Sequence, residues 1–345
     1  MTDSLVLVAN AGDGSISTFR LADGSLERLA VTEGLVGTST FAVDADRDLV
    51  YAGVKPGAGH DSAGIVTLRL DRASGALTPI ARHDLSGGGM NYLALAREGS
   101  VLLGISYGGG YGESWRVADG VLSDAVSRIA YPNLHSVLPS ADGRFAYAVS
   151  LGADLIAQYA LTDDARLEPL SPATVAAPEG SGPRHLVINA AQDAVYVLTE
   201  FTADVLHYAR DTASGTLELR GAASAVDPSV GAAVSRFGVD PRAEHLIWGA
   251  DLHAGAEGRY LWASERTGST LGAVAVNADG TLSAPHAYTV TEPQPRGFGV
   301  SADGAYLVAA GEQSTTVSLY AVDGNTLSLL GQAETGRGAN WVRFV

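Results

Sequence analysis

Apolar and polar residues alternate in short runs along the whole chain, and these runs are separated by turn-forming residues. Ala194–Leu198 and Val205–Ala209 each alternate over about five residues, the pattern of a half-buried β-strand. The neighbouring runs share this pattern, and the connections between them show no amphipathic helix. The pattern within one unit of the chain therefore predicts four short strands, at Arg184–Asn189, Ala194–Glu200, Asp204–Arg210 and Thr216–Ala222.

A tight turn followed by a leucine occurs seven times. Most of these turns contain Asp-Gly or Ser-Gly, which supply the positive φ angles of tight hairpins. The leucines are Leu26, Leu77, Leu122, Leu167, Leu217, Leu282 and Leu327, spaced 51, 45, 45, 50, 65 and 45 residues apart. Seven repeats of four antiparallel strands at this period predict an all-β, seven-bladed β-propeller that spans residues 1–345 as a single domain. An array of two-sheet sandwiches is the alternative, but it does not require a regular count of seven.

The two ends of the chain fit a closed ring. The first unit begins at its second strand, Leu5–Ala9, and a spare first strand, Asn340–Val345, lies at the C-terminus. We therefore expect the C-terminal strand to complete the first blade. The 65-residue spacing indicates an insertion near Ser224 to Gly249, which we interpret as a loop extension.

Composition narrows the possible functions. The chain has a formal net charge of −16, which argues against nucleic acid or an anionic membrane as a partner. It has no cysteine, which excludes disulfides, thiolate zinc sites and a cysteine nucleophile. The histidines have no ligand-like spacing, and no P-loop is possible because the only lysine, Lys55, is followed by Pro56. We expect no metal and no cofactor. No secretory signal or membrane-spanning run is visible, and we expect a cytoplasmic protein.

Strand order predicts which side chains gather at one rim of the propeller. In an antiparallel blade, the start of the first strand and the end of the second meet at the same rim. The first-strand starts are Asn91, His135, Arg184 with His185, Asp251, Arg296 and Asn340; the second-strand ends are Asn10, Lys55, Tyr107, Glu200, Arg266 and Glu312. The only lysine of the chain and three arginines are among them. Such a cluster on an acidic protein favours an anionic ligand, unless its charges simply pair with one another.

A short motif near this rim has the spelling of a catalytic motif but not its structural context. Gly104-Ile105-Ser106-Tyr107-Gly108 has the spelling of a nucleophile elbow. That motif requires a helix after the serine, whereas a glycine-rich loop and another strand are expected here. We interpret the match as coincidence.

Several stretches resemble the seven-bladed lactonase family that contains the bacterial propeller-type 6-phosphogluconolactonase and the fungal carboxy-muconate lactonizing enzyme. The matching stretches are 54–56, 134–136, 182–186 (GPRHL), 196–200, 250–253, 258–267, 291–298 (TEPQPRGF) and 304–311. The resemblance implies lactonase activity and a catalytic set of His135, Arg184, Glu200 and Arg266. The chain departs from the family in the glycine-rich region 88–112 and at Lys55, where an arginine is usual.

Hydrolysis of a δ-lactone requires an activated water, stabilisation of the carbonyl oxygen and a proton for the leaving ring oxygen. We expect Glu200 to be the base or to orient His135, and His135 to transfer the proton. Arg184 and Arg266 are suited to stabilise the oxyanion or to hold an anionic group. Candidates for binding a phosphate are Lys55, His185 and Arg296.

The resemblance favours hydrolysis of 6-phospho-D-glucono-1,5-lactone in the pentose phosphate route, with a small anionic sugar lactone as the partner. Two alternatives remain. One is a lactonase or lactonizing enzyme for a non-phosphorylated carboxylate, and the other is a non-catalytic propeller that binds proteins.

Overall fold

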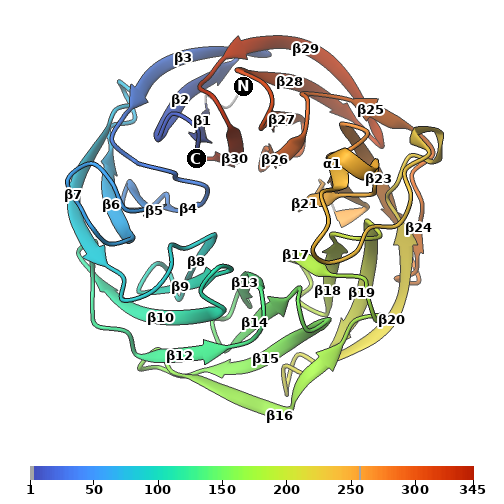
Figure 1. Ribbon diagram of the computed structural model, residues 1–345, viewed down its shortest axis with the longest axis horizontal. Coiled ribbons are helices and arrows are strands. Elements are labelled where there is room, and N and C mark those ends of the chain that lie inside the picture. Colours follow the sequence, from blue (N-terminus) through green and yellow to red (C-terminus); the bar gives the residue numbers. More distant parts are fainter. Residues whose placement is uncertain (1–3, 256–257) are drawn as a thin grey trace.

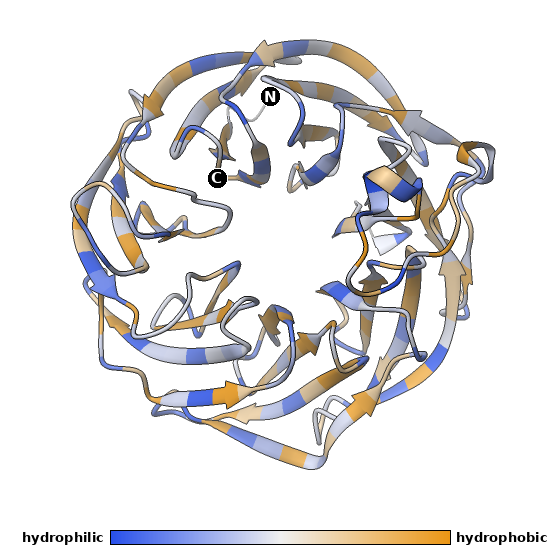
Figure 2. Ribbon diagram, in the orientation of Figure 1, coloured by the Kyte–Doolittle hydropathy of each residue, from blue (hydrophilic) through white to orange (hydrophobic). Residues whose placement is uncertain are grey.

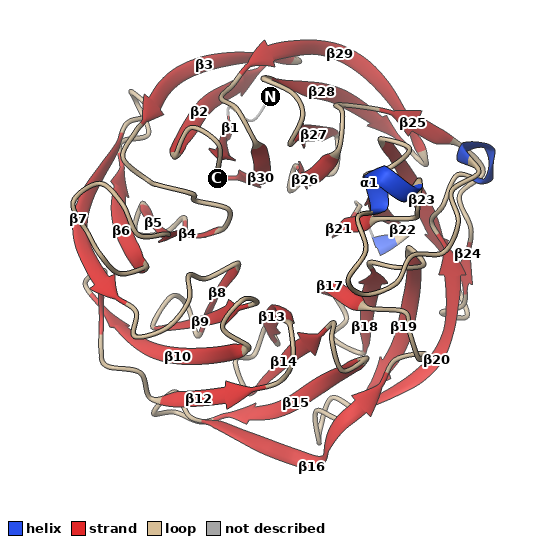
Figure 3. Ribbon diagram, viewed as in Figure 1, coloured by secondary structure: helices blue, strands red, loops and turns tan. Residues whose placement is uncertain are grey.

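The strands form seven separate antiparallel sheets that are arranged in a ring around a common axis (Figure 1). The computed structural model describes residues 4–255 and 258–345. Nearly all of the regular structure is strand (Figure 3). The predicted seven-bladed β-propeller is confirmed, with four antiparallel strands as the basic blade.

Each blade runs from an inner strand near the axis to an outer strand at the perimeter. Blade 1 contains β30 (Ala339–Phe344), β1 (Ser4–Asn10), β2 (Ser15–Ala22) and β3 (Ser25–Thr32). Blade 2 contains β4 (Phe41–Asp44), β5 (Leu49–Val54), β6 (Gly64–Leu70) and β7 (Leu77–Asp84). Blade 3 contains β8 (Tyr92–Ala96), β9 (Val101–Ser106), β10 (Tyr111–Ala118), β11 (Val121–Leu122) and β12 (Ser127–Ala130).

The remaining four blades follow the same order. Blade 4 contains β13 (Leu134–Pro139), β14 (Phe145–Ser150), β15 (Leu155–Leu161) and β16 (Leu167–Ala176), and blade 5 contains β17 (Pro183–Ile188), β18 (Ala194–Thr199), β19 (Asp204–Arg210) and β20 (Leu217–Ser224). Blade 6 contains β21 (Gly249–Ala254), β22 (Tyr260–Glu265), β23 (Thr270–Val276), β24 (Leu282–Ser283) and β25 (Tyr288–Val290), and blade 7 contains β26 (Pro295–Val300), β27 (Tyr306–Gly311), β28 (Thr316–Asp323) and β29 (Thr326–Glu334). In blades 3 and 6 the outer strand is split in two, because β11 and β12 both pair with β10, and β24 and β25 both pair with β23.

The C-terminal strand closes the ring, as the sequence predicts. β30 pairs antiparallel with β1, and Ala9 lies opposite Trp341. The indole Nε1 of Trp341 donates a hydrogen bond of 2.9 Å to the main-chain oxygen of Phe41 in blade 2. The last strand therefore joins the N-terminal blade and also holds the next blade in place.

The apolar core lies between neighbouring blades. Strands in the middle of a blade are buried on both faces, as in β5, whereas outer strands such as β7 keep mostly exposed or half-buried positions. In Figure 2, apolar and polar residues are mixed along the outer strands, as expected for strands with one face toward solvent. Large side chains that are fully buried, among them Trp115, Trp262 and Tyr147, fill the space between sheets. Burial of both faces requires neighbours on each side, which is why the sheets pack in a ring.

The insertion between blades 5 and 6 is a loop extension, as expected. It contains only a 3₁₀ turn, η1 (Pro228–Val230), and one short helix, α1 (Pro241–Glu244), whose first turn is capped by the Asp240 carboxylate. Within the described residues, no helix has the length and apolar character needed to cross a bilayer.

Candidate active site

β-Bulges aim one histidine and two arginine side chains at one end of the ring. In blades 4, 5 and 7 the pairing between the inner strand and its neighbour skips one residue. The skipped residues are His135, Arg184 and Arg296. A bulge takes a residue out of the ladder and turns its side chain away from the regular alternation. The same local irregularity therefore presents three side chains from three blades toward one place.

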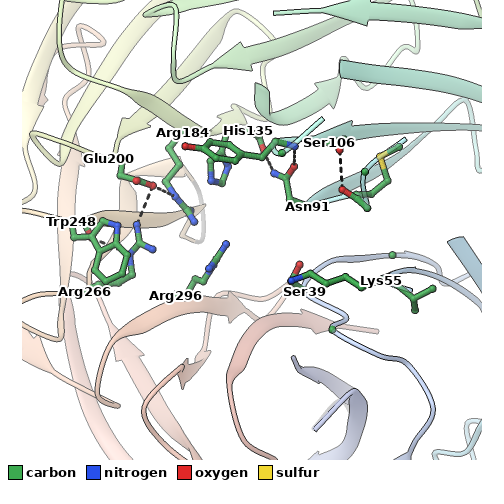
Figure 4. A pocket seen from close by; sticks show the side chains of 18 residues that line it. Ser39, Lys55, Asn91, Ser106, His135, Arg184, Glu200, Trp248, Arg266 and Arg296 are labelled. Atoms are coloured by element: carbon green, nitrogen blue, oxygen red, sulfur yellow. Dashed lines mark hydrogen bonds and ion pairs between the residues drawn. The ribbon is translucent and has the colours of Figure 1, made fainter. Parts of the chain in front are cut away.

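A cavity of about 450 Å³ lies where these side chains meet (Figure 4). This size falls within the range of about 300–1,000 Å³ that is common for small-molecule sites. Its polar and aromatic lining comes from blades 2 to 7 and from the insertion: Ser39, Lys55, Asn91, Ser106, Tyr107, His135, Arg184, Glu200, Trp248, Arg266 and Arg296. Six of the seven residues expected at the site, all except His185, are among them. The prediction that these distant residues converge at one mouth is confirmed, while their individual roles stay predictions.

The cavity is cationic although the protein is acidic. Four cations line it, and Glu200 is the one carboxylate in that lining within the described residues, which leaves a formal charge of +3. The whole chain carries −16. A local field of opposite sign attracts anions to this mouth and holds them there.

Glu200 binds both buried arginines through one oxygen. Its Oε2 accepts a 2.8 Å bond from Nε of Arg184 and a 3.1 Å bond from Nη2 of Arg266. The two guanidinium groups are almost fully buried, with side-chain exposures of 1% and 2%. Burial by itself would raise the pKa of Glu200, but the charges of Arg266 and Arg184 outweigh it and hold this pKa below its ordinary value. Glu200 is therefore ionised at neutral pH.

Main-chain carbonyls and an aromatic ring fix the two arginines further. Arg184 Nη1 donates to the oxygen of Ala250, and Arg266 Nη2 donates to the oxygen of Gly249 at 2.9 Å. The Arg266 guanidinium also lies over the Trp248 ring, 3.7 Å from its centroid. Carbonyl dipoles and a π face compensate part of the cost of burying two cations side by side.

His135 is a neutral histidine at the cavity wall. Burial, and after it the charge of Arg184, lowers the pKa of His135 well below the ordinary value. Its Nδ1 is buried with no hydrogen-bond partner among the described residues. Its ring packs edge-on against Tyr107, with centroids 5.5 Å apart. An unprotonated imidazole in this position is able to accept a proton.

His185 does not reach the cavity, which differs from its expected role in binding a phosphate. Its Nδ1 lies 2.7 Å from Oδ1 of Asp251, and only 4% of its side chain is exposed. It packs behind His135, with ring centroids 5.2 Å apart. The bulge at Arg184 explains the difference, because it turns Arg184 toward the mouth and leaves the next residue in the ladder, facing the interior. Burial lowers the pKa of His185 to about 3, so this ring is neutral.

Four other residues of the predicted rim also remain outside the cavity lining: Asn10, Asp251, Glu312 and Asn340. Asn10 bonds to the hydroxyls of Ser15 and Ser17, and Glu312 accepts a 2.9 Å bond from Arg296. The simpler expectation, that rim charges pair with one another, thus holds for three arginines. Lys55, in contrast, forms no ion pair with any described residue.

The sequence analysis missed Ser39 and Trp248. Ser39 lies two residues before β4, so the rule that marks strand starts in the other blades does not reach it. Trp248 lies at the end of the insertion, where no strand pattern guides the reading. Ser106 also lines the cavity, but β9 leads into a turn and then β10, not into a helix, so the nucleophile-elbow interpretation stays excluded.

Comparisons with known proteins give a family model and relatives that cover nearly the whole chain. Residues 6–344 match the family model "Lactonase, 7-bladed beta-propeller". A protein of Enterobacter sp. (strain 638) named 6-phosphogluconolactonase is 29% identical over 98% of this chain and 97% of its own. A protein of Cronobacter sakazakii with the same name is 28% identical over 98% of this chain and 97% of its own.

Solved structures show the same fold. The Pseudomonas aeruginosa periplasmic gluconolactonase PpgL superposes with a TM-score of 0.85 at 24% identity, covering 100% of this chain and 99% of its own. A protein from Lactobacillus plantarum superposes with a TM-score of 0.86 at 22% identity, covering 100% of both chains. The family model covers nearly every residue, and the chain belongs to the seven-bladed β-propeller lactonase family.

Proposed function

We propose that the protein hydrolyses a sugar δ-lactone, and that this lactone is 6-phospho-D-glucono-1,5-lactone, which is opened to 6-phosphogluconate. The observation that carries the proposal is the cationic cavity, in which an ionised carboxylate and a neutral histidine lie beside two buried arginines. The substrate is an anion with one electrophilic carbonyl, which matches these groups. Relatives that cover nearly the full chain carry the name 6-phosphogluconolactonase.

The reaction adds water across the ester bond of the ring. The water oxygen forms a bond to the carbonyl carbon, the bond between that carbon and the ring oxygen breaks, and a proton from the water passes to the ring oxygen. The products are a carboxylate, a hydroxyl group and one released proton. A general base, an oxyanion site and a proton donor are the protein's contributions.

We assign the proton transfer to His135. Two cations on Oε2 keep Glu200 ionised and make it a weak base. Positive charges from Arg184, Arg296 and Arg266 contribute, after burial, to the low pKa of His135. A bound phosphate would offset these charges and raise the basicity of the imidazole when substrate is present. His135 then takes a proton from water and returns one to the ring oxygen.

Glu200 and the arginines complete the site in this proposal. No bond from a described residue reaches Oε1 of Glu200, which leaves this oxygen able to hold the attacking water. Arg184 and Arg266 are placed to stabilise negative charge on the carbonyl oxygen as it becomes tetrahedral. Such preorganised donors commonly contribute about 10²–10³-fold to the rate.

The test is a pH-stat measurement of acid release from 6-phospho-D-glucono-1,5-lactone, corrected for spontaneous hydrolysis. The purified protein is expected to accelerate ring opening, and a double variant with Arg184→Gln and Glu200→Gln is expected to lose the acceleration. A wild-type rate equal to that of buffer would refute the proposal. The Glu113→Gln variant is a matched control, because Glu113 pairs with Arg128 at 2.8 Å outside the cavity.

A second substrate deserves the same assay. The Pseudomonas aeruginosa relative is named a periplasmic gluconolactonase, which favours plain D-glucono-1,5-lactone as the alternative. Rates on the two lactones, measured side by side, separate the two candidates.

We further propose that the protein acts in the cytoplasm as part of the pentose phosphate route. Its location in a fractionated cell tests that part independently.

A further inference from the structure

Lys55 differs from the other cations of the cavity because none of the described residues provides it with a carboxylate partner. Arg184 and Arg266 share Glu200, and Arg296 is paired with Glu312. Across residues 4–255 and 258–345, no carboxylate lies within ion-pair distance of Lys55. Lys55 is exposed at the cavity, so its charge is solvated and available to an anionic ligand.

Lys55 is held toward the cavity by its surroundings. Its backbone N–H bonds to the oxygen of Val36 at 2.9 Å, which fixes the start of the loop after β5. Its side-chain stem lies against Gly37, whose φ is +61° and where an added Cβ would come within 2.7 Å of Lys55 Cδ. A larger residue at position 37 would be strained and would displace the stem. The stem of the only lysine of the chain thus contacts Gly37, while the residue as a whole is exposed.

Backbone N–H groups lie on the same side of the cavity. Gly88, Gly89 and Gly108 line it, and their N–H groups have no acceptor among the residues that the structure describes. An added Cβ at Gly88 would lie 3.0 Å from Ser106 Oγ, and one at Gly109 would lie 2.5 Å from the Tyr111 ring. Glycine at positions 88 and 109 thus allows the loops to pack closely, and Gly88, Gly89 and Gly108 have no side chain that would cover their main chain at the cavity. Unpaired neighbouring N–H groups beside a cation are a common arrangement for binding phosphate.

The two halves of the cavity therefore have different chemistry. In Figure 4, Lys55 and Ser39 lie across the cavity from Glu200 and Arg266. The Glu200 side holds the cations that are already paired and the ionised carboxylate. The Lys55 side holds a free cation, glycine N–H groups and the Ser39 hydroxyl, with no carboxylate in its lining among the described residues. On the Glu200 side both arginines already share a carboxylate, whereas Lys55 offers a phosphate dianion a charge without a counter-ion among the described residues.

We propose that the Lys55 side of the cavity binds the phosphate group of the substrate and sets the preference for phosphorylated over plain sugar lactones. This inference rests on the proposed lactonase function. The phosphate is on C6, outside the ring, and the carbonyl carbon C1 is joined to C5 through the ring oxygen, so a phosphate at Lys55 leaves the carbonyl free to face His135 and Glu200. Of the three residues expected to bind a phosphate, His185 is bound to Asp251 and Arg296 to Glu312, which leaves Lys55 as the free one.

The kinetic test compares Lys55→Gln and Lys55→Arg on the two lactones. Loss of a hydrogen bond to a charged group costs enough to lower kcat/KM on the phosphorylated lactone by about 10–100-fold in Lys55→Gln. We expect the rate on D-glucono-1,5-lactone to change by less than about threefold, and Lys55→Arg to recover most of the loss. Equal losses on both lactones, or no loss on the phosphorylated one, would overturn the proposal. Arg220→Gln, on the outer strand β20, is a surface-charge control.

A second measurement does not depend on activity. Lys55 carries the only side-chain amine of the chain, so reductive methylation followed by mass spectrometry of peptides reports on this one residue. We expect 6-phosphogluconate to protect Lys55 and gluconate to leave it reactive. Equal methylation with both compounds would overturn the phosphate subsite. If the wild-type protein accelerates neither lactone, the lactonase function fails, and the protection experiment still decides whether Lys55 binds phosphate.

Discussion

Replacement of Glu200 by glutamine separates the chemical role of this carboxylate from its structural role. The variant keeps the shape of the side chain but removes its charge, so the buried guanidinium groups of Arg184 and Arg266 lose their shared counter-ion. Removal of one partner from a buried ion pair costs about 3–5 kcal/mol. The amide oxygen of glutamine can still accept one of the two bonds, and we therefore expect a loss near the lower end, about 3 kcal/mol.

This loss corresponds to a modest change in melting temperature. A chain of 345 residues has an unfolding entropy of about 0.7 kcal/mol/K, taken from about 2.1 cal/mol/K per residue. The melting temperature of Glu200→Gln is then expected to fall by about 4 °C, so the variant stays folded at 25 °C. Differential scanning calorimetry measures this shift, and Glu113→Gln reports what the loss of a carboxylate from an ion pair outside the cavity does by itself.

The kinetic effect is expected to be larger than the effect on binding. Loss of the ionised carboxylate is expected to lower kcat by about 10²-fold or more, the lower end of what groups that assist proton transfer contribute. The formal charge of the cavity lining rises from +3 to +4, so 6-phosphogluconate is expected to bind at least as tightly as to the wild type. Stopped-flow lactone hydrolysis and isothermal titration with the product measure the two quantities. A kcat within about threefold of the wild type, in a folded variant, would refute the catalytic role of Glu200.

Three further predictions concern histidines and ring closure. His135→Asn is expected to lower kcat by about 10²–10⁴-fold, as measured in the same lactone assay, and an unchanged kcat would remove His135 from the proton transfer. Burial lowers the pKa of His185 to about 3, so the unfolded chain binds one more proton than the native protein between this value and the ordinary pKa of 6.5. The free energy of unfolding therefore falls by about 1.4 kcal/mol per pH unit from this group as the pH drops below about 6.5. Melting curves of His185→Asn, measured across this pH range, are expected to show a shallower pH dependence than those of the wild type. An equal slope would contradict a neutral, buried His185. Trp341→Phe leaves the buried oxygen of Phe41 without its donor, which is expected to cost about 1–3 kcal/mol in chemical denaturation, whereas unchanged stability would show that this bond does not hold blade 1 to blade 2.

The sequence predicts the fold well because the strand pattern is local and repeated. In blade 5 the predicted strand Asp204–Arg210 is observed with the same bounds, and Ala194–Glu200 is observed as Ala194–Thr199. Short apolar runs and the turn-forming residues between them set these limits. The sequence predicts a half-buried strand at 194–198, but β18 is buried at all six positions because neighbouring blades cover both of its faces. The closing strand follows from counting strands at the two ends.

The split outer strands could not be predicted in the same way. Outer strands face solvent, as the 73% exposure of Val290 shows, and their sequences carry a weak hydrophobic signal. In blade 6, Pro285 lies between β24 and β25 and cannot donate to a strand ladder. Small interruptions of this kind depend on the pairing with the neighbouring strand.

The site residues were predictable as a group but not always individually. Strand order identifies the mouth at which His135, Arg184 and Glu200 meet. Which of two adjacent residues faces that mouth depends on a bulge, and a shift of one residue exchanges the two faces of a strand. This is why Arg184 lines the cavity and His185 lies behind it. Trp248 was missed because the insertion has no periodic pattern that would place it.

The most direct test of the site is a crystal structure of the wild-type protein with 6-phosphogluconate bound. The phosphate is expected beside Lys55 and the Gly88–Gly89 main chain, and the carboxylate is expected near Arg184 and Arg266, within reach of His135. Binding of the product at another face of the ring, or in the cavity without contact to either Lys55 or the arginines, would contradict the proposed lactonase centre.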